Sequence, residues 1–313
     1  MATMLQPVLE PHPHQKPHSI HSYAGLARPP HLSRLESATQ KKEYIEPLSI
    51  DVDDSRGGFV PGFLHLPPDF ITAPAQSETA KPQMALPPHH HRTAAILLSG
   101  AGGGVTGPSS IYLSLACKLA TLGSGIPTLR LDYRYPAHTQ PCVNDAKAGM
   151  KYLRDMYGLD RFVLVGWSFG GAVVFTVAGE HDEERKEVVG CATIASQTAG
   201  TEGITKLAKR HVPVLLMHGS GDNTLGVGCS QRLWHMYGEG DRMLQVFEGD
   251  NHSLSQNAEQ AEEMLCEFVA KCAGVKVGKE ERKNVVGVEL VEGNERHELM
   301  ERGGDLRAPE RED

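Results

Sequence analysis

The sequence predicts an α/β domain with an open, mostly parallel β-sheet, helices on both faces and an antiparallel hairpin at its start. Three observations support this fold class. Short apolar runs recur along the chain and are too continuous for half-exposed strands. The segments between several of these runs have helical spacing, and two earlier runs are joined by a glycine-containing turn.

The chain has 313 residues, a net charge of -8 and 40% hydrophobic residues. This length favours one large domain with tails, and the acidic balance gives no reason to expect nucleic acid as a partner. No apolar run approaches the roughly 18 residues of a membrane span, and prolines and histidines interrupt any signal-peptide core. We therefore expect a cytoplasmic protein, although an acid-poor N-terminus with Arg28 and Arg34 leaves a mitochondrial presequence open.

The six cysteines contain no CxxC pair, which predicts free thiols in a reducing compartment rather than a disulfide framework or a zinc site. The run His89 to His91 lies in a Pro-rich segment and is interpreted as solvated rather than metal-binding. We expect no metal and no cofactor.

The predicted domain boundaries follow composition. Residues 1–42 are rich in Pro and His and are expected to be disordered, as is a linker at about 72–93 within the folded domain of residues 43–275. Residues 276–313 are dense in both charges apart from "VVGVEL", which predicts a disordered tail or a short partner-binding element.

The predicted strands begin with the hairpin, "PLSIDV" and "FVPGFLHL", whose connection "DDSRGG" is no EF-hand because Arg56 stands where that loop requires glycine. The parallel strands are expected at 94–99, 126–132, 161–166, 188–194, 212–217 and 243–248. Two helical faces are evident between and after them, formed by Val143, Ala146, Met150 and Leu153, and by Ala261, Met264, Leu265, Phe268 and Cys272.

The loop after the first parallel strand, "SGAGGGVTGPSS", contains a GxGxxG match at Gly102, Gly104 and Gly107, and Asp132 ends the following strand. A dinucleotide-binding site would use such a loop and such a carboxylate. However, the match begins several residues beyond its strand, and a hairpin precedes the first βαβ unit. The alternative is that this flexible backbone stabilises an oxyanion, with Asp132 structural or lining the pocket.

The stretch "RFVLVGWSFGGAVVF" holds a complete GxSxG between a predicted strand and a predicted helix, with Ser168 at its centre. At such an elbow a serine hydroxyl is exposed on a strained turn, and Gly166 and Gly170 leave room for it. The alternative is a tight turn that merely needs small residues, but a GxSxG between a strand and a helix favours catalysis. The nucleophile hypothesis therefore requires a histidine and a carboxylate elsewhere.

Both groups follow predicted strands in the required chain order. Asp222 lies in "HGSGD" and His252 in "GDNH", each just beyond an apolar run. Singly, either could be a turn former or a solvated side chain, but their joint placement favours a catalytic triad. Asp250 is the reserve acid, and His218 is interpreted as a residue that orders its loop.

On the motifs "GWSFGG", "HGSGD" and "GDNH", the chain from about Pro47 to Cys272 resembles the α/β-hydrolase superfamily, and within it the small lidless serine esterases, dienelactone-hydrolase-like and acylpeptidase-like enzymes. The resemblance implies an α/β-hydrolase fold in which Ser168 attacks an acyl carbonyl, His252 transfers the proton and Asp222 orients His252. It also implies an oxyanion hole formed by the backbone N–H groups of Phe169 and Ala101. Ser99-Gly100 replaces the His-Gly of many relatives, and serine replaces the cysteine nucleophile of true dienelactone hydrolases.

Only "SQTAGTEGITKLAKRH" separates two strands where larger relatives insert a cap, so no substantial cap domain and a shallow site for small acyl substrates are expected. The predicted function is cleavage of an acyl ester or thioester through a covalent acyl-enzyme. The alternatives are a serine peptidase or acyl-amide hydrolase, a non-enzymatic interaction protein of the same fold and, last, a dinucleotide-binding protein.

Overall fold

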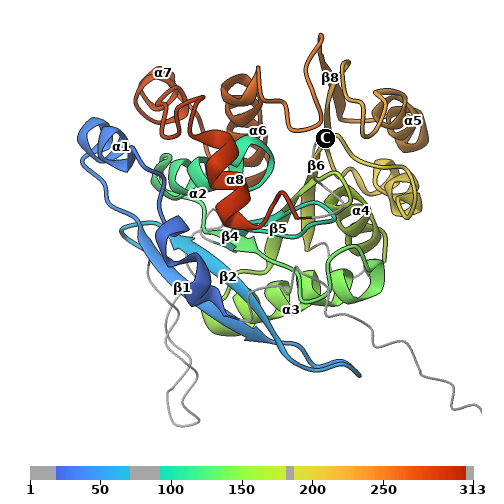
Figure 1. Cartoon of the computed structure of the whole chain (residues 1–313), viewed down its shortest axis with the longest axis horizontal. Coiled ribbons are helices and arrows are strands. Elements are labelled where there is room, and N and C mark those ends of the chain that lie inside the picture. Colours follow the sequence, from blue (N-terminus) through green and yellow to red (C-terminus); the bar gives the residue numbers. More distant parts are fainter. Residues whose placement is uncertain (1–18, 71–91, 181–186, 308–313) are drawn as a thin grey trace, which may run out of the picture.

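The computed structural model describes residues 19–70, 92–180 and 187–307. Its centre is an eight-stranded sheet with the order β1-β2-β4-β3-β5-β6-β7-β8. Figure 1 shows the β1–β2 hairpin on one side of the molecule and β8 on the other. The strands are β1 (Tyr44–Asp51), β2 (Phe59–Leu66), β3 (Thr93–Leu98), β4 (Thr128–Leu131), β5 (Arg161–Trp167), β6 (Val188–Ile194), β7 (Val214–Gly219) and β8 (Arg242–Phe247). β1 and β2 pair antiparallel, β2 is antiparallel to β4, and the remaining pairs are parallel. The predicted fold class is thus confirmed, including the N-terminal hairpin.

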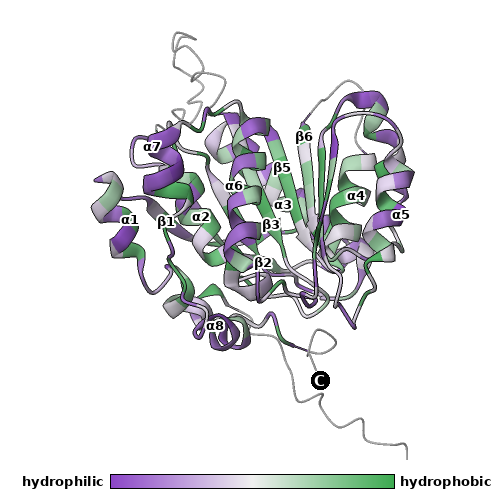
Figure 2. Ribbon diagram, turned by 90° about the horizontal axis from the view of Figure 1, so that it is seen from above, coloured by the Kyte–Doolittle hydropathy of each residue, from purple (hydrophilic) through white to green (hydrophobic). Residues whose placement is uncertain are grey.

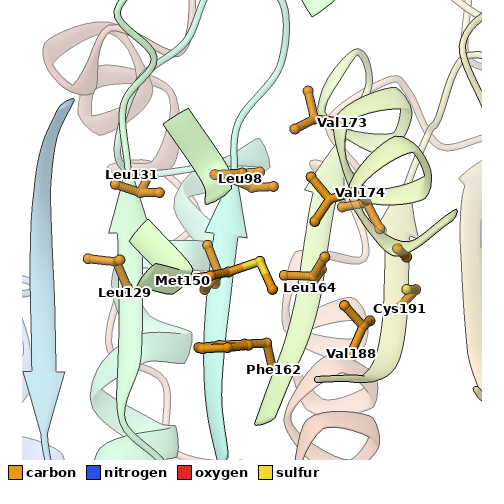
Figure 3. Packing of buried hydrophobic residues seen from close by; sticks show 14 of the residues in the cluster. Leu98, Leu129, Leu131, Met150, Phe162, Leu164, Val173, Val174, Val188 and Cys191 are labelled. Carbon is orange, nitrogen blue, oxygen red and sulfur yellow. The ribbon is translucent and has the colours of Figure 1, made fainter. Parts of the chain in front are cut away.

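Helices cover both faces of this sheet because most of its strands are apolar on both sides. One face packs against α3 (Thr139–Tyr157), α4 (Gly170–Glu180) and α5 (Gly228–Tyr237). Figure 3 shows part of this layer, where Leu98, Leu164 and Val174 lie close together. The opposite face packs against α1 (Leu32–Thr39), α2 (Ile111–Thr121) and α6 (Ala258–Ala273). These two layers form the core.

Two segments expected to be disordered are instead folded in part. Residues 19–42 contain the 3-10 helix η1 (Ile20–Leu26) and α1, and residues 276–307 contain α7 (Lys279–Glu281), the π-helical turn η6 (Arg282–Val286) and α8 (Arg296–Gly303). Most of their larger apolar side chains are buried, among them Tyr23, Leu35, Val286, Leu290 and Leu299. A small number of well-placed apolar anchors outweighs the high charge of the surrounding sequence.

The expected linker at 72–93 and the histidine run His89 to His91 lie outside the described residues, except that residue 92 is described and Thr93 begins β3. The segment expected to replace a cap contains two short 3-10 helices, η4 (Glu202–Lys206) and η5 (Ala208–Arg210), rather than one helix. No large cap covers the sheet in the described part of the chain.

Arg130, on β4, joins the hairpin, the N-terminal segment and the loop after β3. Its guanidinium donates to Nε2 of His65 and to the carbonyl oxygens of Val105, Leu26 and Ala27 at 2.9 to 3.1 Å. The side chain is fully buried, and burial lowers the pKa of the guanidinium to about 10, so it remains charged at neutral pH.

Replacing this guanidinium leaves three carbonyls and an imidazole nitrogen without their donor. We expect Arg130→Met to lower the free energy of unfolding by about 3 kcal/mol or more, measured by urea denaturation. Lys151→Met serves as the control, because Lys151 pairs only with exposed Asp155 one helical turn away; its change should stay within about 0.5 kcal/mol. Equal effects of the two substitutions would contradict the assigned role of Arg130.

Candidate active site

Ser168 lies on the turn between β5 and α4 in a left-handed backbone conformation, with φ of 52°. This conformation is strained for a residue with a side chain and is typical of a nucleophile elbow. A Cβ atom at Gly166 would lie 2.5 Å from the backbone of Gly170, and one at Gly170 would lie 2.5 Å from the carbonyl oxygen of Ser99. Glycine is therefore required at both positions by backbone contacts.

The same contact places the loop after β3 directly against the elbow, since Ser99 follows β3 and Gly170 is the first residue of α4. This loop turns sharply, with the Gly103 amide donating to the carbonyl oxygen of Gly100 at 3.0 Å. Ala101 lies within the turn, half-buried and packed against the core. Ala101 and Phe169, the two expected oxyanion-hole residues, thus belong to adjoining segments.

His252 and Asp222 meet at the same edge of the sheet. They follow β8 and β7, and Nδ1 of His252 lies 2.7 Å from Oδ2 of Asp222. Both side chains are buried. Oδ1 of Asp222 accepts the amides of Thr224 and Leu225, each at 2.8 Å, which fixes the orientation of the carboxylate.

A second histidine contacts the same carboxylate. Nε2 of His218 lies 3.1 Å from Oδ2 of Asp222 and 2.7 Å from the carbonyl oxygen of Leu225, while its Nδ1 lies 2.7 Å from Oγ of Ser230. Burial alone would raise the pKa of Asp222, but hydrogen bonds from His218 and His252 outweigh it and hold that pKa well below the usual range. The carboxylate is therefore ionised at neutral pH, and His218 orders the loop, as its position in the sequence suggests.

Trp167 connects the histidine loop to the elbow, a contact that the sequence analysis missed. Its Nε1 donates to the carbonyl oxygen of His252 at 3.1 Å, and the two rings lie 5.5 Å apart. Because Trp167 immediately precedes Ser168, this bond brings the backbone of His252 next to the elbow. A tryptophan before the serine in "GWSFGG" was the available signal, but nothing local identifies its acceptor.

Asp250, the reserve acid, points elsewhere. Its two oxygens accept from the amides of Asn251, Gln256 and Asn257 and from the Asn257 side chain at 2.8 to 3.1 Å. These bonds cap the turn that leads into α6. Asp222, and not Asp250, is thus the carboxylate placed on His252.

Backbone amides of the GxGxxG loop donate hydrogen bonds to carboxylates from elsewhere in the same chain. The amide of Gly104 donates to Oδ1 of Asp132 at 2.8 Å, and the amides of Thr106 and Gly107 donate to Asp305 at 2.9 and 2.8 Å. Asp132 is fully buried and also accepts a hydrogen bond from the hydroxyl of Tyr23. Its carboxylate therefore stabilises the loop and is not free to bind a ribose. Asp305, which the sequence analysis did not single out, carries no local sequence signal in the charged stretch "GGDLR".

Two groups of side chains in the described ranges have metal-ligand chemistry: Glu43, His65 and Cys117, and His31, Glu292 and Glu295. In the first, the guanidinium of Arg130 donates to Nε2 of His65, so a neutral ring carries its proton on Nδ1, the atom that faces Cys117. In the second, Arg34 pairs with Glu292. Neither group includes a residue of the triad.

In the described part of the chain, none of the helices has the length and apolar character needed to cross a bilayer.

A sequence model of the α/β hydrolase fold matches residues 85–211, which include the elbow and the loop after β3. No curated protein sequence matches the chain. The structure resembles Est1E from Butyrivibrio proteoclasticus, with 18% identity and a TM-score of 0.53 over 73% of this chain and 99% of that one. It also resembles a dienelactone hydrolase from Anabaena variabilis, with 14% identity and a TM-score of 0.55 over 74% and 98% of the two chains.

A third similar structure is an α/β serine hydrolase without a lid from Xanthomonas campestris, with 16% identity and a TM-score of 0.50 over 74% of this chain and 97% of that one. Each of these structures is covered almost completely, while about a quarter of this chain extends beyond them. At these identities the likeness concerns the fold. Strand order, the elbow and the matched sequence segment agree: the chain has the α/β-hydrolase fold that its motifs resemble, and its described residues include no large cap.

Proposed function

We propose that this protein is a serine hydrolase that cleaves acyl esters or thioesters through a covalent acyl-enzyme. One observation carries the proposal: a buried His252–Asp222 pair, with Nδ1 and Oδ2 2.7 Å apart, is joined through Trp167 to the strained elbow that holds Ser168. This combination is the one that activates a serine hydroxyl. The fold supports the assignment, as does its likeness to Est1E and to an α/β serine hydrolase without a lid.

The hydrogen-bond partners determine the tautomer of His252 in this mechanism. Asp222 is ionised and can only accept, so Nδ1 of His252 carries the proton and Nε2 keeps its lone pair. Nε2 then removes the proton of Ser168 as Oγ bonds to the acyl carbon. The imidazolium that forms is stabilised by Asp222 and returns the proton to the leaving alcohol or thiol, after which water attacks the acyl-enzyme in the same way.

The amides of Phe169 and Ala101 are the proposed donors to the carbonyl oxygen as it becomes negative. Small acyl groups are the proposed substrates, because only η4 and η5 occupy the place of a cap. The mechanism needs no cofactor. A cytoplasmic location is proposed on the six cysteines, all of which are described and all of which are free thiols.

Labelling with a fluorophosphonate tests the nucleophile. We expect one adduct on the folded wild-type chain, located on Ser168 by peptide mass spectrometry, and none on Ser168→Ala. With short-chain p-nitrophenyl esters and acyl thioesters, Ser168→Ala should lower kcat about a millionfold, with the melting temperature nearly unchanged. Exposed Ser37→Ala is the control and should behave as wild type. A wild-type chain that is neither labelled nor active would contradict the proposal, and preferential cleavage of acyl amides would favour a peptidase.

The role of Asp222 is tested by Asp222→Asn, whose amide can donate to Nδ1 and favour the wrong imidazole tautomer. We expect kcat/KM to fall about 10⁴-fold. Asp241→Asn, an exposed carboxylate paired with Lys271, is the matched control and should keep wild-type kinetics. An Asp222→Asn enzyme with full activity would exclude Asp222 as the orienting acid.

The same substitution has a pH-dependent effect on stability. The pKa of Asp222 is lower in the folded than in the unfolded chain, whose ordinary value is 3.8, so ionised Asp222 stabilises the fold above that pH and the effect is lost as pH falls below it. The difference in melting temperature between wild type and Asp222→Asn should thus be largest near pH 7 and shrink towards pH 3. A constant difference across this range would contradict the assignment.

A further inference from the structure

The last described residues, 296–307, reach across one end of the sheet and contact the loop between β3 and α2; we term them the C-terminal brace. Figure 2 shows α8, the helical part of the brace, beyond the ends of the strands rather than on either helical layer. The brace lies outside residues 85–211, the segment that matches the fold family. Its contacts with the loop are polar and involve buried groups.

Asp305 is the centre of these contacts and is fully buried. Its Oδ1 accepts from Oγ of Ser99 and, at 2.8 Å, from the amide of Gly107. Its Oδ2 accepts from the amide and the hydroxyl of Thr106 at 2.9 and 2.7 Å. One carboxylate thus holds both ends of the loop from Ser99 to Gly107, which contains Ala101 near its start.

The glycines of the loop fit the brace closely. A Cβ atom at Gly104 would lie 2.4 Å from Cγ of Asp305, and one at Gly102 would lie 2.7 Å from the carbonyl oxygen of Arg307. These two positions therefore lack side chains because the brace occupies that space. The amides that a bound phosphate would need are satisfied internally, which removes the basis of the dinucleotide interpretation.

The brace also supports the histidine loop. Arg296 donates to the carbonyl oxygen of Ser109 at 2.8 Å and accepts at its own carbonyl from Oγ of Ser110. Oγ of Ser109 in turn donates to the carbonyl oxygen of Ser253, the residue after His252, at 2.9 Å. Both loops that flank the Ser168 elbow are consequently connected to one C-terminal element.

We propose that Asp305 is a positioning residue for the reaction: its carboxylate holds the loop between Ser99 and Gly107 so that the Ala101 amide faces the oxyanion. The inference rests on the proposed serine hydrolase function and goes beyond it, because it gives one buried carboxylate near the C-terminal end of the brace a role in the reaction. Asp305 contacts no substrate in this scheme and acts only through the loop.

The surroundings of Asp305 give its ionisation a measurable consequence. Burial raises its pKa to about 6, although the hydrogen bonds from Ser99, Thr106 and Gly107 oppose the rise. The charged and titratable groups near it are Arg130 on β4, Arg307 in the brace, Tyr112 on α2 and Tyr23 on η1. Asp132 shares Tyr23 and Arg307 with this cluster.

The effect of Asp305 protonation on stability distinguishes a loss of loop positioning from a loss of folding. Because the pKa of Asp305 is higher in the folded chain than the ordinary 3.8, the folded state takes up this proton first, so protonation between about pH 6 and 4 does not destabilise the fold. The same proton disrupts the carboxylate that orders the loop. Activity governed by Asp305 should thus fall below about pH 6 without a fall in melting temperature attributable to Asp305.

The experiment compares wild type, Asp305→Asn, Ser99→Ala and Glu298→Gln in full-length protein, with short-chain p-nitrophenyl esters. Glu298 is an exposed carboxylate on α8 that pairs with Arg302, so Glu298→Gln is the matched control with wild-type kinetics. Asp305→Asn should lower kcat about 10- to 100-fold with little change in KM, because an oxyanion contact acts in the transition state. Circular dichroism and the melting temperature verify that each variant is folded.

Ser99→Ala gives the second readout and tests Asp305 with its carboxylate in place. It removes one donor that lowers the pKa of Asp305, so the Asp305-dependent decline in kcat/KM should move to higher pH. In Asp305→Asn the Asp305-dependent part of this decline should be absent, so kcat/KM should fall less steeply on the acid side than in wild type.

The outcomes are distinguishable. A wild-type chain that is not labelled at Ser168 and not active overturns the proposed function and this inference with it. A labelled, active wild type whose kcat and acid profile are unchanged in Asp305→Asn and Ser99→Ala overturns the inference alone. If Asp305→Asn does not fold, Ser99→Ala alone tests the inference: a shift of the decline in kcat/KM to higher pH supports it, and no shift or a shift to lower pH overturns it.

Discussion

The parallel pairing of β3 with β5, of β5 with β6 and of β7 with β8 is the constraint on which the candidate site depends. Parallel strands direct their carboxyl ends to one edge of the sheet, and the register fixes how far each loop projects. Leu98 on β3 stands opposite Gly166 on β5, so the loop that follows β3 starts beside the elbow. A slip of one residue in this register would move Ser168 away from both neighbours.

Within that frame, loop shape is determined by buried carboxylates rather than by apolar packing. Asp222, Asp132 and Asp305 each accept hydrogen bonds from backbone amides in glycine-rich or turn segments. A buried charge is costly unless such donors surround it, so each carboxylate selects the one loop conformation that supplies them. For Asp222 the donors outweigh the cost of burial, while for Asp305 they do not. The ionised carboxylate of Asp305 therefore lowers the free energy of unfolding, as is common for charged groups that take part in function.

Much of the fold and the core of the candidate site could be predicted from the sequence, because both follow local rules. All eight strands were expected: β3 to β8 from continuous apolar runs bounded by glycine or charge, and β1 and β2 from two runs joined by a glycine-containing turn. β1 and β8 are only partly buried, and β1 begins three residues earlier than its apolar run because backbone pairing with β2 extends through Tyr44. Ser168, Asp222 and His252 could be selected because each follows such a run. Asp222 and His252 could then be expected to meet because they follow neighbouring parallel strands, β7 and β8, and not because of their separation in the sequence.

What the sequence could not reveal was pairing across long separations. The brace contains few apolar residues, Leu299 and Met300 among them, so composition favoured a disordered tail. The glycines of "GAGGGVTG" resembled a phosphate-binding loop because the same backbone conformation suits any anion, including a side-chain carboxylate from elsewhere in the chain. No residue near Asp305 in the sequence indicates that its carboxylate binds the amides of this loop.

The separation between Ser99 and Asp305 has a consequence for biosynthesis. The two residues are 206 positions apart, so a ribosome that has finished the loop still needs about 10 to 40 s to add Asp305 at typical rates of elongation. Once synthesis has passed Ser168 the nascent chain contains the elbow, yet until Asp305 is added its glycine-rich loop lacks the carboxylate that shapes it. Translation itself would thus delay the onset of activity until the polypeptide is nearly complete, and prematurely terminated products would be released without a finished site.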